Sequence, residues 1–186
     1  MSGTQTWLPD LIRMTPIELE QYLHGHIPMS KAMQVSVLSV QTDAIILTAP
    51  LEPNINHRAT IFGGSASAVA ILAAWSLLHI RLKRAGISSV LVIQSNTMSY
   101  ASPISGPFTA RSFVHGGAAW ESFMRMLQRK GRARVTISSV LEYKGQIAGE
   151  FRGEFVALGA GAHQSSQAAM PSCGEAAVSA SCREAF

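Results

Sequence analysis

Residues 63–86 read GGSASAVAILAAWSLLHIRLKRAG, and this stretch decides the fold. Apolar side chains, mostly Ala and Leu, occur on every face, which is typical of a helix enclosed on all sides. The cations Arg81, Lys83 and Arg84 fall in the last turns, where they suit the helix dipole, and Gly86 can end the helix. We therefore expect one long buried helix that the rest of the chain wraps around.

The same region raises the question of a membrane span. Residues 59–80 carry no formal charge and are long enough to cross a bilayer. Ser, Thr, Gly and His79 interrupt the stretch, however, and no second hydrophobic span accompanies it. We expect the buried helix of a globular protein and no membrane span.

Segments of alternating apolar residues surround this helix. A capping box from Thr15 to Glu18 predicts a first helix that ends near Gly25, and residues 118–130 read as a short amphipathic helix. Lys144-Gly145 predicts a hairpin turn between the last two strands. The expected strands cover residues 33–40, 45–47, 88–99, 108–115, 134–143 and 146–158.

This order of elements favours an α+β fold in which a curved antiparallel sheet curls around the long central helix. We expect one domain over residues 15–158, preceded by an N-terminal segment at 1–14. Residues 159–186 are rich in Ala, Ser and Gly and predict a disordered tail.

Composition excludes several function classes. The 186 residues carry 15 Lys and Arg against 11 acidic residues, a net charge of +4, which suits an anionic small partner but is too modest to indicate nucleic acid, so we expect no nucleic-acid partner. The two cysteines, Cys173 and Cys182, both lie in the expected tail, so no disulfide framework or paired-cysteine metal site is expected in the core. No export signal is visible, and we expect a cytoplasmic protein without metal or cofactor.

The loop before the long helix carries a family resemblance. Residues 54–65 read NINHRATIFGGS, and Tyr100-Ala101-Ser102-Pro103 and Lys130-Gly131-Arg132 follow later. Together these motifs resemble hotdog-fold thioesterases, most closely the C-terminal thioesterase-like domain of some bacterial acetyltransferase fusions. The resemblance covers about residues 15–158. It implies the hotdog fold, hydrolysis of an acyl-CoA or acyl-carrier-protein thioester, and a homodimer or dimer of dimers with sites between subunits.

The physical reading of Gly63-Gly64 agrees with that chemistry. Glycines let a ligand approach the backbone, and a helix start presents unpaired N–H groups at a positive dipole end. Backbone amides of Gly63 or Gly64 could form an oxyanion hole for a thioester carbonyl, worth about 3 kcal/mol per donor. The alternative is that the glycines only permit tight packing. Ser65 could contact substrate or water, or could simply bond the backbone.

Polar residues of the preceding loop are further candidates. The resemblance suggests that Asn56, six residues before Phe62, orients the attacking water or the thioester, whereas an Asx turn is the structural alternative. His57 could assist proton transfer, or could be an ordinary surface histidine. Asn54, Thr60 and Phe62 are expected to contact substrate.

The sequence departs from the family pattern at two positions. Relatives carry a carboxylate on the buried helix, where this chain has Ile71, and a histidine where it has Phe62. No Asp or Glu occurs between Glu52 and Glu121, so Glu52 and Glu121, from the same or a partner subunit, are the candidates for a carboxylate base. The missing acid keeps open a non-catalytic acyl-thioester binding module. A dehydratase or hydratase, which would need His57 paired with Glu52, ranks last.

Two further groups could bind substrate. Ser95, Thr97 and Ser99 alternate on one strand face and could line an acyl tunnel, or belong to a solvated face. Five cations within ten residues suit the phosphates of coenzyme A or an acidic carrier protein, with a solvated helix face as the alternative. They are Arg125, Arg129, Lys130, Arg132 and Arg134, of which Arg129, Lys130 and Arg132 are the expected substrate contacts.

Overall fold

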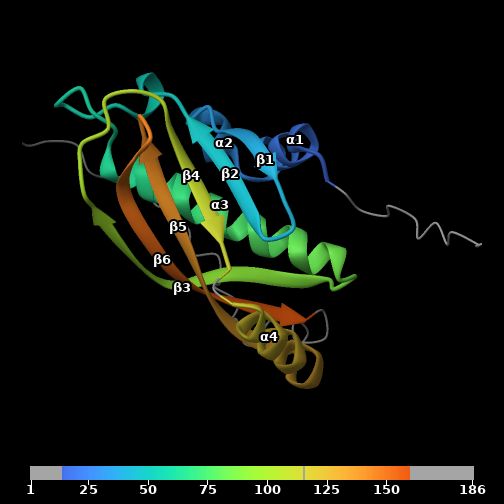
Figure 1. Cartoon of the computed structure of the whole chain (residues 1–186). Coiled ribbons are helices and arrows are strands. Elements are labelled where there is room, and N and C mark those ends of the chain that lie inside the picture. The colour runs from blue at the N-terminus through green and yellow to red at the C-terminus, as the bar shows by residue number, and fades with distance from the viewer. Residues whose placement is uncertain (1–13, 115, 160–186) are drawn as a thin grey trace, which may run out of the picture.

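The structure, a computed structural model, describes residues 14–114 and 116–159 (Figure 1). The expected N-terminal segment and tail, including both cysteines, therefore lie almost entirely outside the described residues.

The first helix, α1 (Pro16–His26), begins as its capping box predicts. The Glu18 amide donates to the Thr15 hydroxyl at 3.2 Å, and the Thr15 amide donates to the Glu18 carboxylate at 2.7 Å. A second helix, α2 (Pro28–Ala32), follows directly, where the sequence predicts only the end of the first helix near Gly25. Proline is equally suited to the first position of a new helix, where its missing N–H costs nothing.

All six expected strands are present and form one antiparallel sheet in the order β1-β2-β4-β5-β6-β3. The turn between β5 and β6 has positive φ at both Lys144 and Gly145, the geometry that twisted hairpins require. The strands are β1 (Ser36–Val40), β2 (Ala44–Ala49), β3 (Ser89–Tyr100), β4 (Phe108–Phe113), β5 (Arg132–Tyr143) and β6 (Gln146–Gly159).

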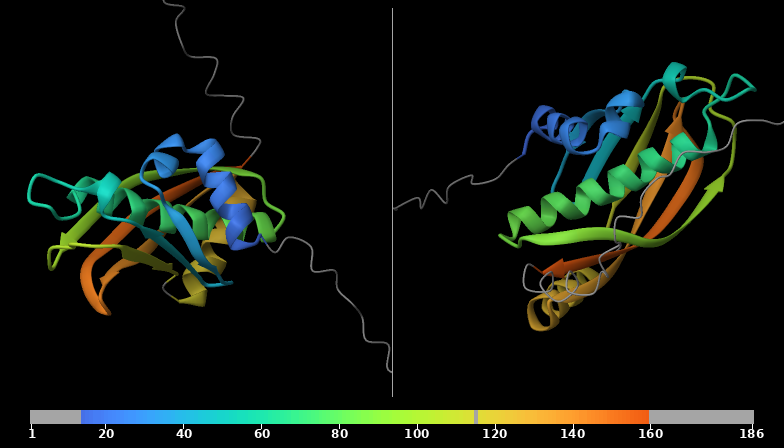
Figure 2. Two further views of the ribbon diagram at one scale, coloured as in Figure 1. Left: turned by 90° about the horizontal axis from the view of Figure 1, so that it is seen from above. Right: turned by 180° about the vertical axis from the view of Figure 1, so that it is seen from behind.

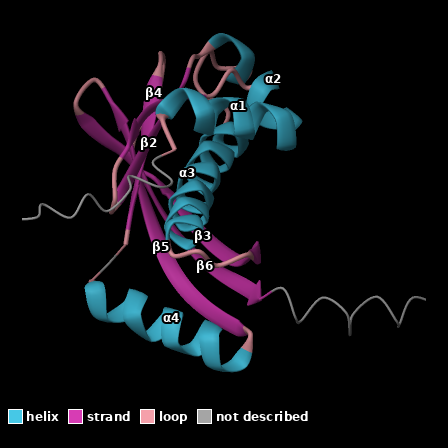
Figure 3. Ribbon diagram, turned by 90° about the vertical axis from the view of Figure 1, so that its right-hand side faces the viewer, coloured by secondary structure: helices cyan, strands magenta, loops and turns pink. Residues whose placement is uncertain are grey.

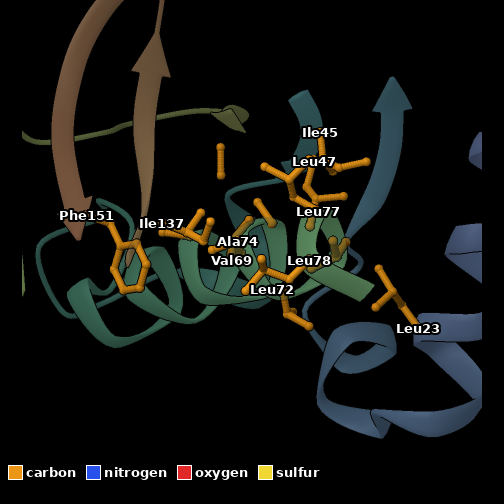
Figure 4. Close-up of a cluster of buried hydrophobic side chains, with 14 of the residues drawn as sticks. Leu23, Ile45, Leu47, Val69, Leu72, Ala74, Leu77, Leu78, Ile137 and Phe151 are labelled. Carbon is orange, nitrogen blue, oxygen red and sulfur yellow. The ribbon is translucent and has the colours of Figure 1, made fainter. Parts of the chain in front are cut away.

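The long helix α3 (Gly63–Arg84) lies in the concave face of this sheet (Figures 2 and 3). Its apolar side chains meet those of β2, β4 and β5 in one core, and Val69, Leu77 and Leu78 are fully buried (Figure 4). The helix is long and apolar enough to cross a membrane, but 61% of its most apolar window is buried inside the fold. A long central helix held by a curved antiparallel sheet is the hotdog fold, as expected.

Buried hydroxyls join the helix to the sheet. The Ser139 hydroxyl on β5 donates to the Ala70 carbonyl of α3 at 3.0 Å and also bonds Ser112 on β4. Because these groups are buried, the bonds satisfy polar atoms that would otherwise destabilise the core. They also show that the odd-numbered residues of β5 face α3, so its even-numbered residues face outward.

The remaining helix, α4 (Gly117–Lys130), connects β4 to β5 and packs along β5. Phe123 and Leu127 are its buried side chains. Figure 3 places α4 at the end of the sheet away from α1 and α2. The Arg81 guanidinium lies 4.2 Å from the centre of the Trp120 ring, so α4 adjoins the C-terminal end of α3.

Candidate functional site

The start of α3 presents three backbone amides without a partner. Phe62 is the N-cap residue, and its side chain makes no capping hydrogen bond. Within the described residues, no carbonyl or side chain accepts from the amides of Gly63, Gly64 and Ser65. Orphan donors at a helix N-terminus are suited to an oxyanion or a carbonyl oxygen.

The first of these residues, Gly63, lines a pocket of about 340 Å³. Gly64 and Ser65 follow it in the same helical turn but do not line this pocket. Its wall is mainly apolar, with Ile61, Ala66 and Ile104 among the lining residues. The Ile61 amide donates to the Ile104 carbonyl at 2.7 Å, which ties the loop before α3 to the loop after β3. We call this the helix-start pocket.

Tyr100 is a site residue whose role the sequence did not indicate. Its hydroxyl donates to the Gly63 carbonyl at 2.7 Å, so the ring lines the pocket beside the first helical residue. The tyrosine stood in the Tyr-Ala-Ser-Pro motif, but only the fold reveals that the end of β3 meets the start of α3. A Cβ added to Gly63 would lie 3.3 Å from this ring.

Large apolar side chains are exposed around the pocket. Ile55 is 49% exposed, Phe62 56% and Tyr100 54%. Exposed apolar surface gathered around a pocket marks a site that a ligand or another chain covers.

The side chain of Asn56 forms hydrogen bonds within its own loop. Its side-chain amide donates to the Thr60 hydroxyl at 3.0 Å and the Ile61 carbonyl at 3.3 Å, and its oxygen accepts from the Arg58 amide at 2.8 Å. This is the Asx turn that the sequence left open as the structural alternative. Asn56 and Thr60 lie together in the loop before the helix start, and their side chains are hydrogen-bonded to each other.

The other loop candidates divide between core and surface. Asn54 is 1% exposed, and its side-chain amide donates to the carbonyls of Met33 at 2.9 Å and Pro50 at 2.8 Å. Its side-chain oxygen is buried without a partner in the described structure. His57 is exposed in the loop.

No carboxylate or histidine is among the described residues that line the helix-start pocket. Glu52 is exposed in the short helix η1 (Glu52–Asn54), and Glu121 lies on α4, near the other end of α3. Ile71 packs against the hydrophobic core. Tyr100 is thus the one titratable side chain on the pocket wall in the described chain.

The remaining candidates lie away from the pocket. Ser95 is exposed on the outer face of the sheet, where its hydroxyl donates to Glu154 on β6 at 3.2 Å. Arg129, Lys130 and Arg132 are exposed where α4 meets β5. The structure does not bring these four residues to the helix-start pocket within one protomer.

A second titratable cluster joins α1 to α3. The His79 ring stacks on Trp75 at 4.7 Å and on Tyr22 at 4.9 Å, and Tyr22 stacks on His26 at 4.1 Å. Burial, reinforced by Lys83 and then His26, lowers the pKa of His79 below its usual value. In the described part of the chain, no three His, Cys, Asp or Glu side chains gather as metal ligands would.

Comparison with known proteins agrees with this architecture. The model of the family described as "Putative thioesterase (yiiD_Cterm)" matches residues 17–159. A protein of unknown function from Chlorobaculum tepidum TLS is similar at 28% identity and a TM-score of 0.73, over 78% of this chain and 98% of that one.

Two further solved structures extend the comparison. A protein called a putative thioesterase, from Shewanella oneidensis, is 25% identical with a TM-score of 0.69, over 77% of this chain and 96% of that one. A thioesterase from Haemophilus influenzae, at 13% identity and a TM-score of 0.63 over 78% of this chain and 91% of that one, shares the fold.

Proposed function

Since the chain belongs to the "Putative thioesterase (yiiD_Cterm)" family, we propose that it is an acyl thioesterase that hydrolyses an acyl-CoA or acyl-carrier-protein thioester at the helix-start pocket. The observation that carries this proposal is a helix start whose first three amides, those of Gly63, Gly64 and Ser65, are unpaired in the described structure, and whose first residue, Gly63, lines an apolar pocket of about 340 Å³.

The proposed reaction uses these amides on the thioester oxygen. Water adds to the carbonyl carbon and loses one proton, which the departing sulfur later takes up. The carbonyl oxygen becomes an oxyanion, and the amides of Gly63 and Gly64 stabilise its charge. Collapse of the tetrahedral intermediate breaks the C–S bond, releasing the thiol and the carboxylic acid. The apolar wall of the pocket receives the acyl group. Asn56 acts by holding the loop that precedes the amides.

We propose further that the active species is a homodimer, or a dimer of dimers, formed through β3. This edge strand has 12 residues, none of them charged and none a proline, and Val92 is 45% exposed. Unpaired edges of that kind are normally protected by charge, proline or a cover. The opposite edge, β1, has five residues, and the Val37 amide donates to the Glu20 carboxylate of α1 at 2.9 Å.

Two-fold pairing of β3 has a consequence for the site. Antiparallel pairing sets the Ser89 end of one strand beside the Tyr100 end of its copy. Each helix-start pocket then lies at the same end of the assembly as the partner's α4. The described pocket wall holds no carboxylate or histidine that could act as a base, and in this arrangement the second subunit could supply one.

The dimer is tested by size-exclusion chromatography with light scattering. Wild type should elute as a dimer or a tetramer, and Val92→Lys, which places a charge on β3, should shift it toward monomer. Leu38→Lys on β1 is the matched control, because Leu38 is also an exposed apolar residue of an edge strand, and it should leave the assembly unchanged. A wild-type monomer would refute pairing through β3.

The reaction is tested with purified protein and a panel of acyl-CoAs, with the released thiol detected by colour. Turnover that depends on acyl chain length is the expected result. The second candidate is a non-catalytic acyl-thioester binding module, favoured by the absence of a carboxylate or histidine from the described pocket lining. Measurable acyl-CoA binding with no turnover would replace the enzyme proposal with this one.

A further inference from the structure

A larger groove lies between α4 and the outer face of β5 and β6. Its volume is about 680 Å³, twice that of the helix-start pocket. Phe123 and Met126 of α4 form an apolar side, and Met126 is 42% exposed. The opposite side carries Arg134, Thr136 and Arg152. We call this the α4 groove.

The two arginines mark separate positions along the groove. Arg152 on β6 pairs with Ser138 on β5, whereas Arg134 lies four residues earlier on β5. At about 3.3 Å per residue, the two backbones are about 13 Å apart along the strands. A ligand that contacts both guanidinium groups is therefore extended and carries more than one anionic group.

Carboxylates near the two arginines decide how much of their charge is available to a ligand. In the described part of the chain, no carboxylate pairs with the guanidinium of Arg134 or Arg152, and both side chains are exposed. Glu154 lies between the two arginines on the same face, because it pairs with Thr136, but its carboxylate accepts a hydrogen bond from Ser95 and forms no ion pair with either guanidinium in the described structure. A ligand that spans both arginines therefore places its anionic groups at the two ends and not beside Glu154. Planar guanidinium groups that lack a carboxylate are suited to bidentate binding of phosphate oxygens.

We propose that the α4 groove binds an organic ligand with two separated phosphate groups, of the kind that coenzyme A carries. Arg134 and Arg152 bind the phosphates, while the exposed Met126 contacts the uncharged part between or beside them. The exposed cations Arg129, Lys130 and Arg132 adjoin the groove and add to the attraction of an anion. This site is distinct from the helix-start pocket, and it rests on the proposed function only in the choice of coenzyme A as probe.

The test is calorimetric titration of the full-length protein with coenzyme A. The double variant Arg134→Gln/Arg152→Gln should bind about tenfold more weakly, because charge-assisted hydrogen bonds are lost at both positions. Arg111→Gln is the matched control. Arg111 is an exposed arginine on the outer face of β4 that does not line the groove, so its loss should change affinity less than about twofold.

Two further probes separate the ligand's parts. Pantetheine, which has no phosphate, should bind weakly and equally to wild type and the double variant. Inorganic phosphate should bind much more weakly than coenzyme A. Phosphate that binds as tightly as coenzyme A, and is lost in the double variant, would identify a free-anion site and overturn the proposal. Equal losses in the double variant and Arg111→Gln, or no binding of coenzyme A by wild type, would also overturn it.

This experiment is separable from the test of the enzyme. Hydrolysis of a phosphate-free thioester, such as an acyl N-acetylcysteamine, should be the same in wild type and the double variant. If the double variant loses coenzyme A binding and the wild type has no thioesterase activity, the α4 groove is supported as a binding site and the proposed reaction is refuted. Thioesterase activity in the wild type, together with an unchanged coenzyme A affinity in the double variant, would support the reaction and refute the proposed role of the α4 groove.

Discussion

Replacing Asn56 by Ala should destabilise the protein as well as slow it. The shortest side-chain bonds are from the Arg58 amide at 2.8 Å and to the Thr60 hydroxyl at 3.0 Å, while the bond to the Ile61 carbonyl is longer, at 3.3 Å. Each of the two short bonds contributes about 1 kcal/mol, and less where water can replace the lost partner of an exposed group. The free energy of unfolding of the variant should therefore be about 1–2 kcal/mol lower than that of the wild type.

Urea unfolding followed by circular dichroism measures this loss directly. Thr60→Val is the matched control, because it removes the hydroxyl partner but leaves the bond from the Arg58 amide to Asn56, so it should cost about half as much. Turnover should fall in both variants in the order of their stability losses, since both loosen the loop before the helix. An Asn56→Ala protein with wild-type stability and greatly reduced turnover would refute this reasoning and place the side chain in the reaction itself.

Three other predictions follow from buried or crowded positions. Gly64→Ala should leave the melting temperature unchanged or raise it, because Ala favours helix and the exposed Phe62 ring can move from the new Cβ, but turnover should fall; equal turnover would show that close approach is not needed. Leu77→Ala should cost about 2–5 kcal/mol in urea unfolding, whereas Leu38→Ala, at an exposed position, should cost almost nothing. The pKa of His79 in the folded protein lies below 6.5, so as the pH falls the unfolded chain takes up the proton of this histidine first. The free energy of unfolding should therefore fall as the pH drops below about 6.5. Urea midpoints measured from about pH 8 to about pH 5 should show this dependence, and His79→Phe should flatten it.

The fold could be predicted because its signals are local and agree with one another. The all-apolar stretch of α3, the capping box at Thr15 and the Lys144-Gly145 turn each specify one conformation without help from distant residues. Helix α2 was missed because Pro28 has two meanings, an end and a beginning, and sequence alone does not choose between them.

The site was less predictable because its contacts join distant segments. The sequence indicated the glycines at the start of α3, but the bond from Tyr100 to Gly63 spans 37 residues and depends on sheet order. We expected the cations near residue 130 and the glycines at the start of α3 to bind the same substrate molecule. Helix α4, which ends in these cations, lies instead near the opposite end of α3. Periodicity does not report which end of a helix a later helix approaches.

The position of β3 also constrains how the chain is made. Its one described neighbour in the sheet is β6, the last strand of the described residues, so β3 leaves the ribosome before its partner has been synthesised. The hairpin of β5 and β6 closes locally and quickly, whereas pairing of β3 with β6 must close a loop that contains β4, α4 and β5. A twelve-residue strand without a charge is thus left without its described sheet partner while β4, α4 and β5 are synthesised. We expect nascent chains of this protein to be prone to aggregation during that interval.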